Sequence, residues 1–205
     1  MAAQSPDESL VARTAATYAA TAEHFDDAPL SFWDRYGRRS VARLGLQPGA
    51  SVLDACCGTG ASAIPAAAQV GPGGRVLGVD LSEPALALAR TKAEAAGLHN
   101  VAFRAVDIRS AELAAGSFDA VVCVFGIFFL PDMVAGLRDL WQLVRPGGRL
   151  ALTVWGPGLF EPAASEFWRA VRAEQASPGG SDHEYRPWDR LTSPEAVAEL
   201  FSAAG

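Results

Sequence analysis

The strongest constraint on this chain is a short apolar run that ends at an acid and then breaks into small residues and glycines. The segment is Ser51–Gly60, SVLDACCGTG, and an alanine-rich stretch from Ala61 to about Val70 follows it. The pattern predicts a strand, a tight turn and a helix start. Glycine lets a ligand approach the backbone closely, and the first helical N–H groups carry the positive end of the helix dipole. Such a corner favours a nucleotide-like cofactor.

Strand-like and helix-like segments alternate from this point onward. The expected strands, which are short and apolar, are Ser51–Ala55, Arg75–Val79, Val101–Ala105, Phe118–Val124 and Gly148–Trp155. The expected helices are Gly60–Val70, Glu83–Ala96, Met133–Leu143, Pro162–Ala176 and a last helix capped by Ser193. Alternation of this kind predicts an α/β fold with right-handed crossovers and a mostly parallel sheet.

The N-terminal part has a different organisation. Residues 7–23 and 31–44 are expected to form helices, and the sequence GLQPG at 45–49 then breaks the chain. We therefore expect residues 1–45 to form an N-terminal helical cap or lid, and residues 46–205 to form one α/β unit.

Charge and composition narrow the choice of partner. The net charge is −6 and the only lysine is Lys92, which disfavours a broad nucleic-acid surface and favours a small-molecule substrate. No run reaches the length of a membrane span and the N-terminus lacks a signal-peptide pattern, so a cytoplasmic location is expected. The three cysteines at 56, 57 and 123 suit neither a disulfide framework nor a structural metal site. We expect no bound metal.

Acidic residues follow three consecutive predicted strands. Asp54 stands at the first turn, Asp80 ends the second strand, and Asp107-Ile108 follows the third. In an open α/β sheet the ligand lies beyond the carboxyl ends of the strands, where Asp80 would grip ribose hydroxyls. Asp107 would accept a hydrogen bond from an adenine amino group, with Ile108 against the ring. Each acid alone has an ordinary structural explanation, but the three together favour a nucleotide site.

These residues alone leave open which nucleotide-like cofactor the chain binds. Gly58–Ala63 formally satisfies the dinucleotide pattern G-x-G-x-x-G/A, and Asp80 follows at a suitable distance. Two features weigh against a nicotinamide dinucleotide. Asp54 would repel a diphosphate, and the chain has no second half for a nicotinamide and its substrate.

The chain resembles the class I S-adenosylmethionine-dependent methyltransferases, near the ubiquinone/menaquinone-biosynthesis-like branch. The resemblance covers about residues 18–205. Five segments carry it, in order: Val52–Gly60, Val79–Ser82, Val106–Ile108, Phe118–Asp132 and Leu143–Leu150. It implies a Rossmann-like three-layer sandwich, although the family's sixth and seventh strands have no counterpart before Gly205.

The resemblance also implies roles for individual residues. The methionine part of the cofactor would contact Asp54, Cys56, Gly58 and Gly60. The ribose and adenine would contact Asp80, Leu81, Asp107 and Ile108. The sulfonium and its methyl group would lie beside Val124 and Phe125. The family usually has glycine or alanine where Cys56 stands, which would crowd the carboxylate end.

The expected activity is methyl transfer from S-adenosylmethionine to a small organic molecule, with carbon, oxygen and nitrogen acceptors all open. The alternatives are an NAD(P)-dependent oxidoreductase and a non-catalytic cofactor-binding domain. No motif for a general base is visible, and His24 is better explained as an ordinary surface histidine. Among the aromatic residues, Phe125, Phe128 and Trp155 are expected to face the substrate pocket.

Overall fold

The fold is centred on a five-stranded, fully parallel sheet. The computed structural model describes residues 6–158, 161–174 and 187–205. The strands are β1 (Ser51–Ala55), β2 (Arg75–Asp80), β3 (Val101–Ala105), β4 (Phe118–Val124) and β5 (Val144–Thr153). Their order in the sheet is β3-β2-β1-β4-β5. This confirms the predicted Rossmann-like α/β fold, and the described residues contain no sixth or seventh strand.

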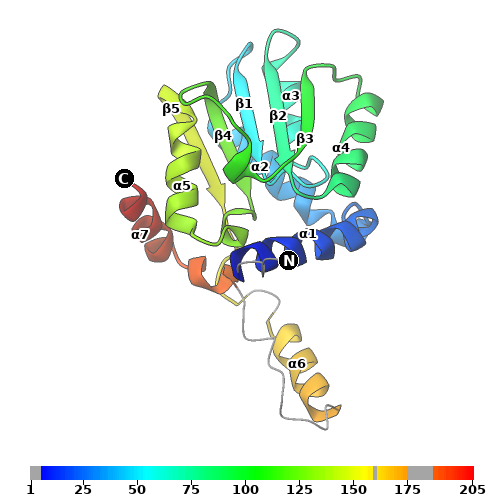
Figure 1. The fold of residues 1–205 in the computed structure, drawn as a ribbon. Coiled ribbons are helices and arrows are strands. Elements are labelled where there is room, and N and C mark those ends of the chain that lie inside the picture. The colour runs from blue at the N-terminus through cyan, green and yellow to red at the C-terminus, as the bar shows by residue number, and fades with distance from the viewer. Residues whose placement is uncertain (1–5, 159–160, 175–186) are drawn as a thin grey trace, which may run out of the picture.

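Helices flank the sheet on both faces (Figure 1). The α-helices are α1 (Pro6–Thr21), α2 (Phe32–Leu44), α3 (Ala63–Val70), α4 (Glu83–Ala95), α5 (Met133–Gln142), α6 (Ala163–Glu174) and α7 (Pro194–Ala204). Serine side chains cap the N-termini of α4 and α7, and the second of these, Ser193, is the cap that the sequence predicts. The Ala85 N–H donates to Ser82 Oγ over 3.3 Å, and the Ala196 N–H donates to Ser193 Oγ over 3.1 Å.

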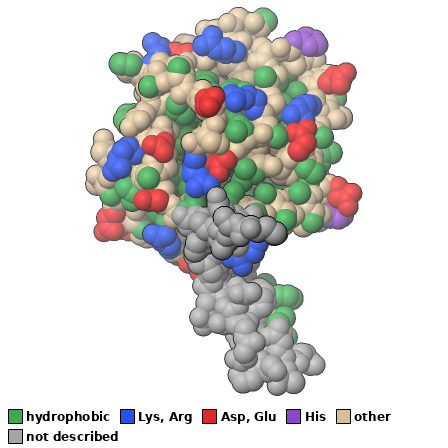
Figure 2. Space-filling view, viewed as in Figure 1, with side chains coloured by type: hydrophobic (Ala, Val, Ile, Leu, Met, Phe, Trp, Pro, Cys, Tyr) green, Lys and Arg blue, Asp and Glu red, His purple; other side chains and the backbone are tan. Residues whose placement is uncertain are grey.

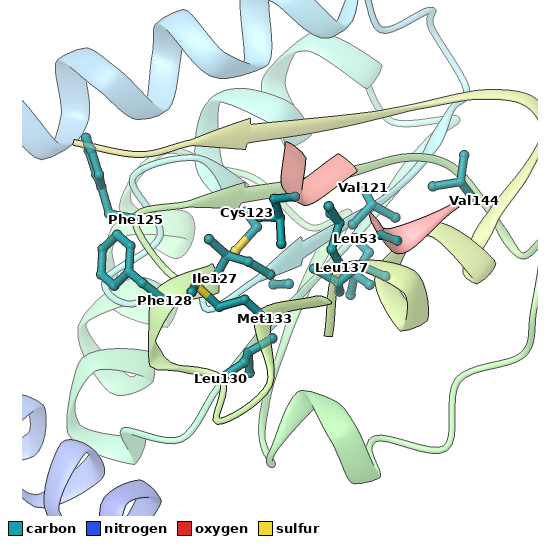
Figure 3. Packing of buried hydrophobic residues seen from close by; sticks show 14 of the residues in the cluster. Leu53, Val121, Cys123, Phe125, Ile127, Phe128, Leu130, Met133, Leu137 and Val144 are labelled. Carbon is teal, nitrogen blue, oxygen red and sulfur yellow. The ribbon is translucent and has the colours of Figure 1, made fainter. Parts of the chain in front are cut away.

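Side chains of β1 alternate between two hydrophobic clusters because successive residues of a strand point to opposite faces. Val52 packs with α2 and α3, whereas Leu53 packs with α5 and α7. Both side chains are fully buried, as expected for a central strand of a parallel sheet. In the cluster that contains Leu53, Phe125 and Phe128 lie at one end and Val144 at the other (Figure 3).

Strand β5 begins at Val144, four residues before the predicted Gly148. The register with β4 jumps from Phe118↔Val144 to Ala120↔Arg149, so a bulge accommodates the sequence RPGG between the two paired parts.

The N-terminal helix α1 lies across the carboxyl ends of the strands, whereas α6 projects away from the sheet (Figure 1). Two short 3-10 turns, Ala22–His24 and Ala28–Leu30, connect α1 to α2. Within the described part of the chain, no helix is both long and apolar enough to cross a membrane. The last two residues of the predicted helix Pro162–Ala176 lie outside the described residues.

Candidate cofactor and substrate site

Two adjoining cavities lie at the carboxyl ends of the parallel strands. The larger encloses about 920 Å³ of empty space when its open mouth is counted, and the smaller about 390 Å³. The cavities share wall residues Thr14, Cys56, Asp80, Leu81 and Phe129. We treat the two neighbouring cavities together as the candidate site.

The turn after β1 forms the floor of the larger cavity. Cys56, Gly58 and Gly60 all have positive φ values, of 59°, 51° and 86°. Cys56 is the notable case, because side chains disfavour this left-handed conformation and it clusters at functional sites. Phe125, after β4, has a φ of 55° and lines the same cavity. The strained backbone therefore lies where the site was expected.

Gly126 brings the ends of β1 and β4 into close contact. A Cβ atom at this position would lie 2.5 Å from Cys56 Cβ and 2.9 Å from the sulfur atoms of Cys56 and Cys123. Only glycine fits here without a shift of its neighbours.

Asp80 connects the end of β2 to the turn after β1. Its carboxylate accepts the Gly58 N–H over 2.9 Å and the Ser82 N–H over 2.9 Å. Burial raises the pKa of Asp80 above the usual carboxyl range, and the backbone hydrogen bonds from Ser82 and Gly58 oppose the rise. The half-buried carboxylate faces both cavities and has acceptor capacity beyond these two bonds.

Asp54 lies behind the cavity wall rather than in it. Its side chain is fully buried, and Ser62 Oγ donates to Asp54 Oδ2 over 2.7 Å. The other oxygen, Oδ1, has no hydrogen-bond partner within the described residues. Burial raises the pKa of Asp54 to about 7, and the nearby negative charge of Asp80 adds to the rise. Ser62 lines the larger cavity and connects it to this buried acid.

Asp107 and Ile108 line the smaller cavity. Arg109 Nη2 donates to Asp107 Oδ2 over 2.6 Å, and the Arg109 N–H donates to Asp107 Oδ1 over 2.9 Å. Although partial burial acts to raise it, the pKa of Asp107 is lowered, because these bonds from Arg109 outweigh the loss of solvent. An ionised carboxylate therefore lies beside an apolar side chain at the end of β3.

Aromatic rings form the outer wall of the larger cavity, and they come largely from the N-terminal helices. The lining includes Tyr18, Phe25, Trp33, Phe125 and Phe129. Tyr18 meets Phe129 with ring centroids 5.2 Å apart, and Trp33 meets Phe125 at 5.4 Å. The indole N–H of Trp33 is buried and has no hydrogen-bond partner within the described residues.

Two of the three aromatic residues expected in the pocket lie elsewhere. Phe128 is buried in the core and Trp155 stacks on Phe125 at 3.8 Å, so neither belongs to the lining of the larger cavity. Phe128 and Phe129 are neighbours in the 3-10 turn Ile127–Phe129, so their side chains point in different directions. Only Phe129 lines the larger cavity. His24 is mostly exposed and its Nδ1 lies 3.1 Å from Asp27 Oδ2, in keeping with a surface histidine.

The structure brings most of the sequence-predicted cofactor residues together. Those that line one or both cavities are Cys56, Gly58, Asp80, Leu81, Asp107, Ile108, Val124 and Phe125. Asp54 and Gly60 lie behind the lining. Sequence reasoning missed Tyr18 and Ser62 as site residues. Ser62 had a usable signal, because it falls at a predicted helix start beside the glycine turn.

The comparisons with known proteins agree with this arrangement. Residues 52–148 match the methyltransferase domain family. The chain is 36% identical over 129 residues to a nocamycin O-methyltransferase from Saccharothrix syringae, which covers 63% of this chain and 46% of that protein. It is also 36% identical over 117 residues to a demethylmenaquinone methyltransferase from Listeria welshimeri, and this aligned stretch covers 57% of this chain and 50% of that protein.

A solved structure of an S-adenosylmethionine-dependent methyltransferase from Aquifex aeolicus has the same fold, with a TM-score of 0.63 and 21% identity. It covers 91% of this chain, and this chain covers 87% of it. The chain therefore shares its fold with S-adenosylmethionine-dependent methyltransferases, and its middle part is similar to their methyltransferase domain. The chain spans about half the length of the curated relatives it matches.

Proposed function

We propose that this chain binds S-adenosylmethionine and transfers its methyl group to a small organic acceptor. One observation carries the proposal: a glycine turn, two acids and an aromatic wall surround neighbouring cavities at the carboxyl ends of four neighbouring strands. Ligands of open α/β sheets bind at this edge. The names of the relatives support methyl transfer as the chemistry.

The residues present fit an adenosine that carries a charged amino-acid tail. Asp80 has lone pairs to spare for ribose hydroxyls, with Leu81 beside it. Asp107 and Ile108 offer an acceptor and an apolar surface for adenine in the smaller cavity. Asp54 lies behind the glycine turn and is connected to the cavity through Ser62, so it supports the turn that would hold the amino-acid tail.

The bound cofactor supplies an activated methyl group on its sulfonium. The chain then has to bring the acceptor atom in line with that group and keep water away. Val124 and Phe125 line the part of the cavity at the end of β4, and Phe125 is fixed by its stack on Trp155. No covalent catalyst is required. A general base matters only where the acceptor arrives protonated.

The aromatic wall supports a small and largely apolar substrate. Tyr18, Phe25 and Trp33 come from the N-terminal segment, which supports residues 1–45 as a cap over the site of residues 46–205. The net charge of −6 argues against a nucleic-acid substrate. On the face shown in Figure 2, acidic and basic side chains are interspersed rather than gathered into one basic patch. A cytoplasmic location fits a substrate of this kind.

Calorimetry with two cofactors tests the proposal. S-adenosylhomocysteine should bind in the low micromolar range or tighter, and NADH should give no heat. A methyl-transfer screen over phenols, quinone precursors and amines, with radiolabelled cofactor, would then identify the acceptor class. Heat with NADH but none with S-adenosylhomocysteine would contradict the proposal. Cofactor binding without turnover across the screen would favour a non-catalytic domain.

A further inference from the structure

The only lysine of the chain joins three separate parts of the fold. Lys92 lies on α4, and its Nζ donates to Asp26 Oδ1 over 2.7 Å and to Thr59 Oγ1 over 3.1 Å. Thr59 Oγ1 in turn donates to Asp26 Oδ1 over 3.1 Å. We call these three residues the clasp. Asp26 belongs to the N-terminal cap and Thr59 to the glycine turn.

The clasp connects two segments that line the larger cavity. Thr59 lines the cavity from the glycine turn, and Phe25, the neighbour of Asp26, lines it from the cap. Phe25 packs against Tyr18 and Trp33 at 5.5 Å each. A bond that holds Asp26 therefore also holds the aromatic wall of the cap in place over the turn.

The ion pair of the clasp is less exposed to solvent than the other ion pair of α4. The side chains of Lys92 and Asp26 are 31% and 35% exposed, whereas the Arg90–Glu83 pair on the same helix is 43% and 58% exposed. Surface pairs contribute little and are screened by salt. The Lys92–Asp26 pair is partly shielded and reinforced by a shared hydroxyl, so its loss should be measurable.

We propose that Lys92 is a positioning residue, which holds the N-terminal cap on the glycine turn and so slows the escape of the bound cofactor. The inference rests on the proposed function, because it assumes that the cavity takes S-adenosylmethionine. Lys92 does not line either cavity, so it acts through Asp26 and Thr59.

The test measures the affinity and dissociation rate of S-adenosylhomocysteine in the full chain. Lys92→Met should raise Kd about tenfold, mainly through faster dissociation, while Lys92→Arg retains most of the affinity. Glu83→Gln is the matched control, because it breaks the other ion pair of α4 without touching the cap. An unchanged Kd and dissociation rate in folded Lys92→Met, or an equal loss in Glu83→Gln, would overturn the inference.

A single lysine also permits a chemical test of the charge. Acetylation of Lys92 removes its charge and should weaken binding as Lys92→Met does, whereas reductive methylation keeps the charge and should preserve binding. Equal effects of the two modifications would contradict a role for the ion pair.

A cofactor-free measurement separates this inference from the proposed function. Arg13 lies on α1 and is exposed, so trypsin cleavage after it reports on release of the cap. Lys92→Met should speed this cleavage about tenfold, and Glu83→Gln should not. If the wild-type chain failed to bind S-adenosylhomocysteine, the proposed function would fail, yet this comparison would still decide the clasp.

Discussion

The Asp80 carboxylate, at the end of β2, accepts the backbone N–H of Gly58, 22 residues earlier in the turn after β1, over 2.9 Å. The acid proposed to hold the ribose therefore also sets the shape of the turn proposed to hold the methionine tail. The two halves of the cofactor site are mechanically linked. A change at Asp80 should affect both.

Asp80→Asn should weaken S-adenosylhomocysteine binding about ten- to hundredfold, because hydrogen bonds to a charged group contribute about 1.5–3 kcal/mol. The amide oxygen retains one acceptor for the backbone, so the fold should survive. Calorimetry at pH 7.5 provides the measurement. Asp139→Asn, an exposed change on α5, is the matched control and should bind as wild type does. Equal affinity in the two variants would remove Asp80 from the site.

Asp54 should make the unfolding free energy depend on pH. Its folded pKa of about 7 lies above the ordinary carboxyl value of 3.8, so the folded state favours the neutral acid. Below about pH 4 both states are protonated and there is no penalty. Between pH 4 and 7 the unfolded state ionises first, so the unfolding free energy falls as pH rises. Above pH 7 the penalty is complete, at about 4 kcal/mol.

Asp54→Asn mimics the neutral acid at every pH. Its stability advantage over wild type should therefore grow from pH 4 to pH 7 and then level off. Urea unfolding of both proteins at each pH isolates this one group, since every other titration is common to them. An advantage that stayed constant or shrank as pH rises would show that Asp54 is not held neutral by burial.

The fold was largely predictable because its signals are local. The apolar runs of β1, β3 and β4 have the predicted bounds, and Ser82 and Ser193 cap the predicted helices. The start of β5 was wrong by four residues. Its bulge over the sequence RPGG is fixed by pairing with β4, which single-sequence reasoning does not see.

The site was predictable where it follows strand ends and not where it depends on packing. Asp80 and Asp107 lie at the cavities because parallel strands end at one edge. Tyr18 lines the larger cavity only because α1 packs across the carboxyl ends of the strands. The sequence around Tyr18 contains no signal for that packing.

Gly126→Ala should destabilise the fold by about 2 kcal/mol, because the added Cβ would meet Cys56 and Cys123 at less than 3 Å. Cys56→Gly alone should be nearly neutral, since relief of its left-handed strain offsets the entropy of glycine. In the double variant the cost of Gly126→Ala should fall by about 1 kcal/mol. Denaturant unfolding of all four proteins completes the cycle, and strictly additive effects would contradict the proposed contact.

Phe128 and Phe129 should separate stability from binding. Phe128→Leu removes volume from the core and should lower the unfolding free energy by about 1–2 kcal/mol with little effect on the Kd of S-adenosylhomocysteine. Phe129→Leu alters the wall of both cavities and should raise that Kd severalfold at a smaller cost in stability. The reverse pattern would show that the cavity wall is wrongly assigned.

The most direct test is a crystal structure of the chain grown with S-adenosylhomocysteine. The account predicts adenine against Ile108 in the smaller cavity, ribose hydroxyls within hydrogen-bond reach of Asp80, and the sulfur atom beside Phe125. Electron density for the ligand away from the strand ends, or bound there with Asp80 turned out of reach of the ribose, would contradict it.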